Sequence, residues 1–197
     1  MIHIEEHTFL NPLFIFAMES EAGNSFDDVN TVFTGLGKIN AGYHLLKAIS
    51  RFSPDIIVNL GTAGSSFFAR GELVCCTNFI QRDMDVSSLG FSAFQTPFES
   101  IPIVLTNGIA LPGFSQGTCG SGDNFEVGHK TDAYNVIDME GYALAKVALL
   151  ENIPFISLKF ISDGADDSAA SDWTESVKLA AQKLRSAIDR FMTKVDG

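Results

Sequence analysis

The sequence predicts an α/β domain in which helices cover a mostly parallel sheet. Three observations support this class. Short apolar, β-branched runs recur along the chain, helical patterns separate several of them, and no internal repeat or linker interrupts the 197 residues. Hydrophobic residues make up 46% of the chain, enough for a core that covers both faces of such a sheet. We therefore expect one domain over residues 1–197.

Runs with the length and composition of strands cover residues 13–18, 30–34, 55–60, 72–80, 101–105, 134–139 and 155–161. Apolar residues at helical spacing predict helices over residues 38–52, 140–151 and 172–194. The stretch 82–100 contains a proline, a glycine and several serines. It predicts an irregular loop that serves either an active site or an oligomer contact.

Composition excludes several classes of partner. The net charge of −11 and the lack of a basic run disfavour nucleic acid and polyanionic membranes. No segment approaches the ~20 consecutive apolar residues of a membrane span, and the first residues do not form a secretory signal. Cys75, Cys76 and Cys119 are too few and too irregular for a disulfide framework or a zinc site. We expect reduced thiols in a cytoplasmic protein without a metal.

Acidic residues follow three of the predicted strands. Glu21 comes after the run 13–18, Asp138 and Glu140 stand at the end of the run 134–139, and Asp163 follows the run 155–161. In an open α/β sheet, ligands bind at the carboxyl ends of the strands. Carboxylates at three such ends therefore predict one site that reads polar groups and handles protons.

A turn of small residues, Asn59 to Ser65, follows another predicted strand and would let a ligand approach the backbone closely. It is not a phosphate-binding P-loop, because no Gly-Lys-Ser/Thr follows. The segment Gly35-Leu36-Gly37 lacks the third glycine and the acidic residue of the dinucleotide fingerprint. A nicotinamide enzyme is therefore disfavoured.

Six segments in order resemble the nucleoside phosphorylase/nucleosidase superfamily, and most closely the methylthioadenosine/S-adenosylhomocysteine nucleosidases. They are Ala17-Met18-Glu19-Ser20-Glu21, Gly35-Leu36-Gly37-Lys38, Asn59-Leu60-Gly61-Thr62-Ala63-Gly64, Gly120-Ser121-Gly122-Asp123-Asn124-Phe125, Asp138-Met139-Glu140 and Ile161-Ser162-Asp163. The resemblance implies a three-layer α/β/α sandwich around a mixed, partly closed sheet. It also implies a cofactor-free reaction that breaks the bond between ribose C1′ and a purine nitrogen through an oxocarbenium-like transition state.

The resemblance assigns roles to the strand-end carboxylates. Asp163 matches the acid that donates a proton to purine N7, and Glu21 matches the residue that positions and activates water. Glu140, with Met139 below the sugar, matches the grip on the ribose hydroxyls. A carboxylate that accepts from both hydroxyls favours the positive charge that develops on the sugar.

The base site is assigned in the same way. Phe125 matches an aromatic residue that stacks on the purine. Glu126 would read the purine edge through its backbone, although family members usually carry an apolar residue there. Trp173 stands where the family places an aromatic residue that closes over the base, and it is equally suited to anchor the last helix. The resemblance also places four small residues at the substrate, Thr62, Ala63, Gly64 and Ser162.

The loop 82–100 resembles the segment that reaches the partner's pocket for the 5′-substituent in family dimers. Its Val86 and Leu89 suit an alkylthio tail, although the family often has an aromatic residue at the position of Leu89. The resemblance therefore implies a homodimer in which these two side chains complete the partner's site.

Hydrolysis is favoured over phosphorolysis. Asn59 stands where the phosphorylases carry an arginine for phosphate, and Glu21 would repel a phosphate dianion. Arg82 and Arg70 are the nearest cations, and we interpret them as solvated surface charges. The expected substrate is methylthioadenosine or S-adenosylhomocysteine. The alternatives are a futalosine hydrolase, a phosphate-dependent purine nucleoside phosphorylase, and a non-catalytic nucleoside-binding protein, which the three retained carboxylates disfavour.

Overall fold

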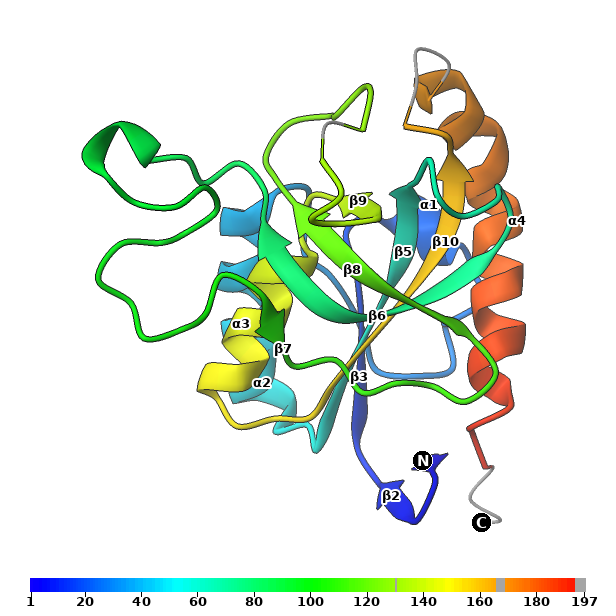
Figure 1. Ribbon diagram of the computed structural model, residues 1–197. Helices are drawn as coiled ribbons and strands as arrows, with labels where there is room; N and C mark the ends of the chain where they lie inside the picture. Colours follow the sequence, from blue (N-terminus) through cyan, green and yellow to red (C-terminus); the bar gives the residue numbers. More distant parts are fainter. Residues whose placement is uncertain (130, 166–168, 194–197) are drawn as a thin grey trace.

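The computed structural model describes residues 1–129, 131–165 and 169–193, with the backbone alone for 169–175. The strands are β1 (Ile2–Ile4), β2 (His7–Phe9), β3 (Pro12–Phe16), β4 (Thr31–Phe33), β5 (Ile56–Gly64), β6 (Leu73–Gln81), β7 (Leu105–Thr106), β8 (Ser115–Ser121), β9 (Val136–Asp138) and β10 (Phe155–Asp163). The helices are α1 (Glu19–Ala22), α2 (Lys38–Phe52), the short 3₁₀ helix η1 (Ser87–Leu89), α3 (Gly141–Leu150) and α4 (Ala169–Asp189) (Figure 1).

The main sheet is mixed and partly closed. Its strands follow the order β10-β6-β8-β9-β5-β3-β4, and β10 also pairs with β5, which joins five strands into a ring. The pairs β3–β4, β3–β5, β5–β10, β6–β8 and β8–β9 are parallel, whereas β6–β10, β5–β9 and β6–β7 are antiparallel. The sheet is thus mostly parallel, as predicted, and it becomes mixed because the helix-free turn after β5 sends the chain back into β6. The mixed, partly closed sheet implied by the resemblance is confirmed.

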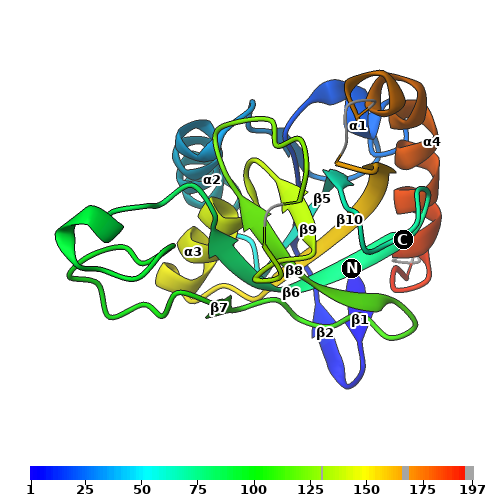
Figure 2. The ribbon, with the colours of Figure 1, turned by 45° about the horizontal axis from the view of Figure 1, so that its top comes forward.

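Helices cover both sides of this sheet. Helices α2 and α3 lie on one side and α4 lies on the other (Figures 1 and 2). One apolar cluster packs α2 and α3 against the sheet, and a second packs α4 and the β1–β2 hairpin. Strands β5 and β10 are buried along nearly their whole length, which explains why they read as continuous apolar runs in the sequence.

The structure also departs from the predicted elements. The predicted strand 101–105 is wrong except at its end, where Leu105 begins the two-residue β7. Strand β8 was not predicted because its residues are small and mostly polar. Close packing of neighbouring side chains requires its glycines. A Cβ on Gly120 would lie 2.5 Å from the ring of Tyr134. The β1–β2 hairpin was missed too, and the last helix begins and ends earlier than predicted.

Two expectations from composition concern thiols and membranes. Cys75, Cys76 and Cys119 are buried and free. Burial raises the pKa of the Cys75 thiol to about 11 and that of Cys119 well above its ordinary value. Within the described part of the chain, no helix has the length and apolarity needed to cross a membrane.

Candidate active site

A cavity of about 360 Å³ opens at the carboxyl ends of the central strands. It is lined by Ala17, Met18, Glu21, Leu36, Thr62, Ala63, Gly64, Arg82, Asn124, Phe125, Glu126, Ile137, Asp138, Met139, Glu140, Ser162, Asp163 and Ala165. Its size is in the range of small-molecule sites, and its wall is mostly apolar with a few convergent polar groups. The carboxylates that follow three predicted strands therefore meet in one place.

Most residues assigned to the site by resemblance lie in this wall. The residues that do so are Glu21, Thr62, Ala63, Gly64, Phe125, Glu126, Met139, Glu140, Ser162 and Asp163. The side chain of Trp173 lies outside the described residues. Val86 and Leu89 do not line the cavity of this chain. They lie in the loop 82–100, and Leu89 is 73% exposed. Because their assigned role is in a second copy, it stays a prediction.

Several lining residues had no role assigned from the sequence. They are Ala17, Met18, Leu36, Arg82, Asn124, Ile137 and Ala165. Most of them belong to, or directly adjoin, the six matched segments, so the segments themselves were the available signal. Arg82 had no such signal, because its partners come from a distant part of the chain.

Glu21 is held by the start of the small-residue turn. One of its oxygens, Oε1, accepts from the Thr62 N–H at 2.8 Å and from the Thr62 hydroxyl at 2.7 Å. The Met18 N–H donates to Oε2 at 3.3 Å. A Cβ on Gly61 would lie 3.1 Å from Oε1, so a glycine in β5 allows the carboxylate to approach. Glu21 is thus fixed and buried, with acceptor capacity left for a water in the cavity.

Asp163 ends strand β10 after a shift in register. The pairing with β5 skips a residue between Ile161 and Asp163, and such bulges re-aim side chains. The Ser162 hydroxyl donates to Asp163 Oδ2 at 2.7 Å, and the Ala165 N–H donates to Oδ1 at 2.9 Å. A Cβ on Gly64 would lie 2.7 Å from Oδ1, so only glycine there leaves room for the carboxylate.

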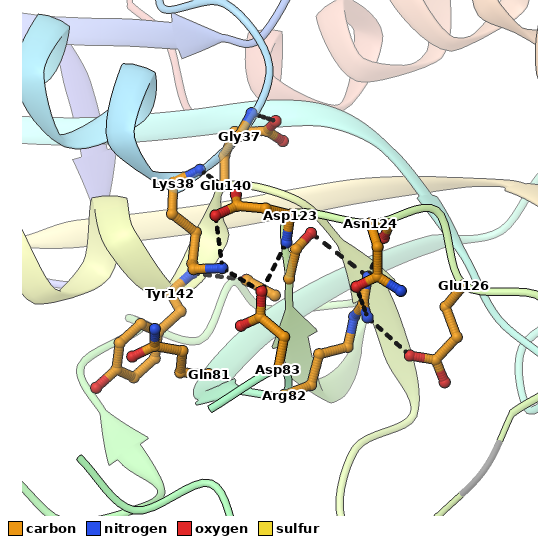
Figure 3. Close-up of polar contacts among 12 residues, drawn as sticks. Gly37, Lys38, Gln81, Arg82, Asp83, Asp123, Asn124, Glu126, Glu140 and Tyr142 are labelled. Carbon is orange, nitrogen blue, oxygen red and sulfur yellow. Dashed lines mark hydrogen bonds and ion pairs between the residues drawn. The ribbon is translucent and has the colours of Figure 1, made fainter. Parts of the chain in front are cut away.

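Glu140 lies across the cavity, beside the start of α2. The Gly37 N–H donates to its Oε1 at 2.7 Å (Figure 3). Burial, and after it the neighbouring Asp138 carboxylate, raises the pKa of Glu140 to about 8. The site therefore contains a carboxyl group that gains and loses a proton near neutral pH.

Asp138 behaves in the opposite way because it is paired. The Lys159 ammonium lies 2.9 Å from its Oδ2, and the Ser121 hydroxyl and the Gly141 N–H also donate to it. Burial raises the pKa of Asp138, but these partners outweigh burial and keep it below its ordinary range. Lys159 stands inside the apolar run 155–161, and a charged residue in such a buried strand indicates a buried ion pair.

The raised pKa of Glu140 predicts a dependence of stability on pH. Between pH 4.5 and about 8 the folded protein holds a proton that the unfolded chain releases, so stability falls as pH rises. Glu140→Gln removes this term. We expect the free energy of unfolding of the wild type, relative to that of Glu140→Gln, to fall by up to about 1.4 kcal/mol per pH unit in this window. Urea titrations at several pH values measure it, and parallel curves would contradict it.

The interpretation of Arg82 as a solvated surface charge is wrong, because its side chain is buried. It is 8% exposed, and its Nη1 lies 2.9 Å from Glu126 Oε2 and donates to Asn124 Oδ1 at 2.9 Å (Figure 3). The Tyr134 hydroxyl donates to the other oxygen of Glu126 at 2.9 Å. The side chain of Glu126 is thus already engaged, which leaves its backbone to meet a ligand.

No metal arrangement emerges from the described ranges, where no group of three or more His, Cys, Asp or Glu side chains could hold an ion. The cavity wall offers three carboxyl groups held by hydrogen bonds, Glu21, Glu140 and Asp163, together with an aromatic side chain, Phe125. Such a set can bind hydroxyl groups, orient a water and move protons.

Sequence comparison finds curated relatives over most of the chain. The 5′-methylthioadenosine/S-adenosylhomocysteine nucleosidase of Buchnera aphidicola subsp. Schizaphis graminum is 26% identical over 189 residues, with 85% of this chain and 80% of that protein covered. The enzyme of the same name from Haemophilus influenzae is 28% identical over 183 residues, with 82% and 79% covered.

Solved structures share the fold. The 5′-methylthioadenosine/S-adenosylhomocysteine nucleosidase of Neisseria meningitidis, in complex with methylthio-immucillin-A, superposes with a TM-score of 0.80 at 22% identity, covering 92% of this chain and 98% of that one. A futalosine hydrolase mutant of Helicobacter pylori gives a TM-score of 0.82 at 17% identity, with 92% and 98% covered. The family model of the phosphorylase superfamily matches residues 21–194, and the chain therefore belongs to the phosphorylase superfamily.

Proposed function

We propose that this protein hydrolyses the N-glycosidic bond of a purine nucleoside, with 5′-methylthioadenosine and S-adenosylhomocysteine as its first candidate substrates. The observation that carries the proposal is the meeting of Glu21, Glu140 and Asp163 in one cavity, at the ends of three strands. The curated relatives support the candidate substrates, because they bear the names of nucleosidases for these two compounds.

Each carboxylate has a separate task in this reaction. Asp163 passes a proton to purine N7, and the C1′–N bond breaks with its electron pair leaving on the base. Glu140, in its ionised form, accepts from the ribose hydroxyls and stabilises the positive charge on the sugar, so this role requires the loss of the proton that its raised pKa retains. Glu21 takes a proton from a water molecule while the oxygen of that water bonds to C1′. The products are the free purine and a ribose with a hydroxyl at C1′.

Water suits this cavity better than phosphate does. Asn59, at the position of the phosphorylase arginine, does not line the cavity; its amide donates to the Ile15 carbonyl and accepts from the Ser157 hydroxyl. Arg82 is the cation in the described lining, and its charge is already paired with Glu126. A phosphate dianion would therefore meet Glu21 without a compensating cation.

Futalosine remains the second candidate substrate. The fold similarity to a futalosine hydrolase is comparable to that to the nucleosidases, whose TM-scores lie on both sides of it. The wall near Phe125 also carries a charged pair, Arg82 and Glu126, where an apolar residue is expected in the nucleosidases. Because these two side chains are engaged with each other and with their neighbours, they do not select between an adenine and a 6-oxopurine, and the assay below separates the two substrates.

We also propose that the protein acts as a homodimer. Helix α2 and the turn before it present exposed apolar side chains beside the cavity, Leu36, Ile39, Tyr43 and Leu46. Ile39 is 83% exposed, and such a patch is typical of an interaction surface. Light scattering would show twice the mass of 21.3 kDa, and a fully active monomer would contradict the proposal.

The testing experiment is base release in phosphate-free buffer. We expect adenine from methylthioadenosine and S-adenosylhomocysteine, with inosine and futalosine assayed in parallel. Release of hypoxanthine from futalosine alone would move the substrate to the second candidate. Release that requires phosphate and gives ribose 1-phosphate would overturn hydrolysis. No release from any nucleoside would overturn the enzymatic proposal.

A further inference from the structure

The base-binding loop, residues 122–126 after β8, supplies much of one cavity wall. It carries Asn124, Phe125 and Glu126, yet it forms neither a helix nor a strand. Phe125 is 55% exposed, so the loop is not fixed by burial of this side chain. Its position must therefore depend on polar contacts with other elements.

Lys38, the first residue of α2, makes one set of these contacts. Its ammonium lies 2.5 Å from Asp83 Oδ2 and 3.0 Å from Asp123 Oδ2, and its N–H donates to Asp123 Oδ1 at 2.7 Å (Figure 3). The Asp123 N–H donates to Asp83 Oδ2 at 2.9 Å. Burial raises the pKa of Asp83, but Lys38 and this N–H outweigh burial and lower it. The three side chains form a closed cluster at the start of the loop.

Arg82 holds the loop from the neighbouring position. Its guanidinium donates to the carbonyls of Gly122 and Asn124, in addition to its contacts with the Asn124 and Glu126 side chains. Consecutive residues after β6, Arg82 and Asp83, therefore fix both the backbone and the side chains of the loop.

The same helix start also holds the ribose side of the cavity. Gly37, directly before Lys38, donates its N–H to Glu140. The two adjacent N–H groups of Gly37 and Lys38 thus bind one carboxylate from each side of the cavity, Glu140 and Asp123. The helix dipole favours both carboxylates at this end.

We infer that Lys38 and Asp83 are positioning residues that hold the base-binding loop in register with the ribose-binding Glu140. Neither residue lines the cavity, so each acts through the loop. The loop must present the base so that its N7 faces Asp163 while the sugar contacts Glu140. The catalytic consequence of this inference rests on the proposed function, whereas the ordering of the loop does not.

The test compares Lys38→Met with Lys38→Arg and with a matched control, Lys146→Met. Lys146 is also a helical lysine in an ion pair, 2.6 Å from Glu99, but this partner lies outside the base-binding loop, whereas Lys38 pairs with Asp123 inside it. Amide hydrogen exchange of the peptide that spans 122–126 is measured first. We expect exchange about tenfold faster in Lys38→Met, little change in Lys38→Arg, and no change in Lys146→Met.

Kinetics then test the catalytic consequence. We expect kcat/KM of Lys38→Met to fall about 10- to 100-fold, because a misplacement of 1 Å can cost about a hundredfold. Unchanged exchange in Lys38→Met would overturn the inference whether or not the wild type is an enzyme. Faster exchange with unchanged kcat/KM would overturn the positioning role. A wild type inactive on every nucleoside would overturn the proposed function and leave the exchange test intact.

Discussion

Asp163→Asn will lower kcat for base release by about 10³-fold, within the range of 10²–10⁴ that general acids contribute. An amide at this position cannot deliver a proton to purine N7. The fold should survive, because the Asn oxygen can still accept from the Ala165 N–H, and the Ser162 hydroxyl can turn to accept from the amide. Steady-state kinetics and thermal unfolding of the variant measure the two effects separately.

The matched control for this prediction is Asp55→Asn. Asp55 also accepts two hydrogen bonds, from the N–H groups of Leu10 and Asn11 at 2.6 and 3.0 Å, but it lies at the opposite end of β5 and outside the cavity. We expect it to lose some stability and to keep its activity. A 7-deaza nucleoside, which has no N7 to accept the proton, should be a poor substrate for the wild type. An Asp163→Asn variant with full kcat on the natural nucleoside would remove Asp163 from the mechanism.

The sequence was sufficient to predict the carboxylate half of the site. Buried strands such as β5 and β10 are apolar on both faces, so their ends are visible in the sequence as the points where acidic or small residues appear. Because carboxyl ends of parallel strands meet at one edge, Glu21 and Asp163 could be placed together before any coordinates. Helix α2 was predicted with its observed bounds for a similar reason, its clear periodicity.

The polar contacts that fix the base-binding loop could not be predicted in this way. Arg82 and Asn124 are 42 residues apart, and neither lies in a periodic segment that would bring them together. Their contact exists because β6 and β8 run parallel, and β8 itself has too many small residues to be recognised as a strand. Gly117 and Gly120 are needed in β8 because neighbouring side chains leave no room for a Cβ, and these neighbours are brought there only when the sheet packs.

Glu21→Gln is expected to lower kcat/KM by about 10²–10⁴, because a neutral amide cannot take the proton from the attacking water. The Gln oxygen can still accept from the N–H and the hydroxyl of Thr62, and only the longer hydrogen bond from the Met18 N–H, at 3.3 Å, is lost, so most of the local geometry is kept. The matched control is Glu72→Gln. Glu72 likewise accepts from a hydroxyl and a backbone N–H, those of Ser115 and Ala69, outside the cavity.

An external nucleophile separates the role of Glu21 from that of Asp163. Azide needs no base to become nucleophilic, so it should restore base release in Glu21→Gln, with a glycosyl azide as the sugar product. It should restore none in Asp163→Asn, because the purine would still leave without a proton. Rescue of both variants, or of neither, would contradict the division of labour in which Glu21 acts on the water and Asp163 acts on the base.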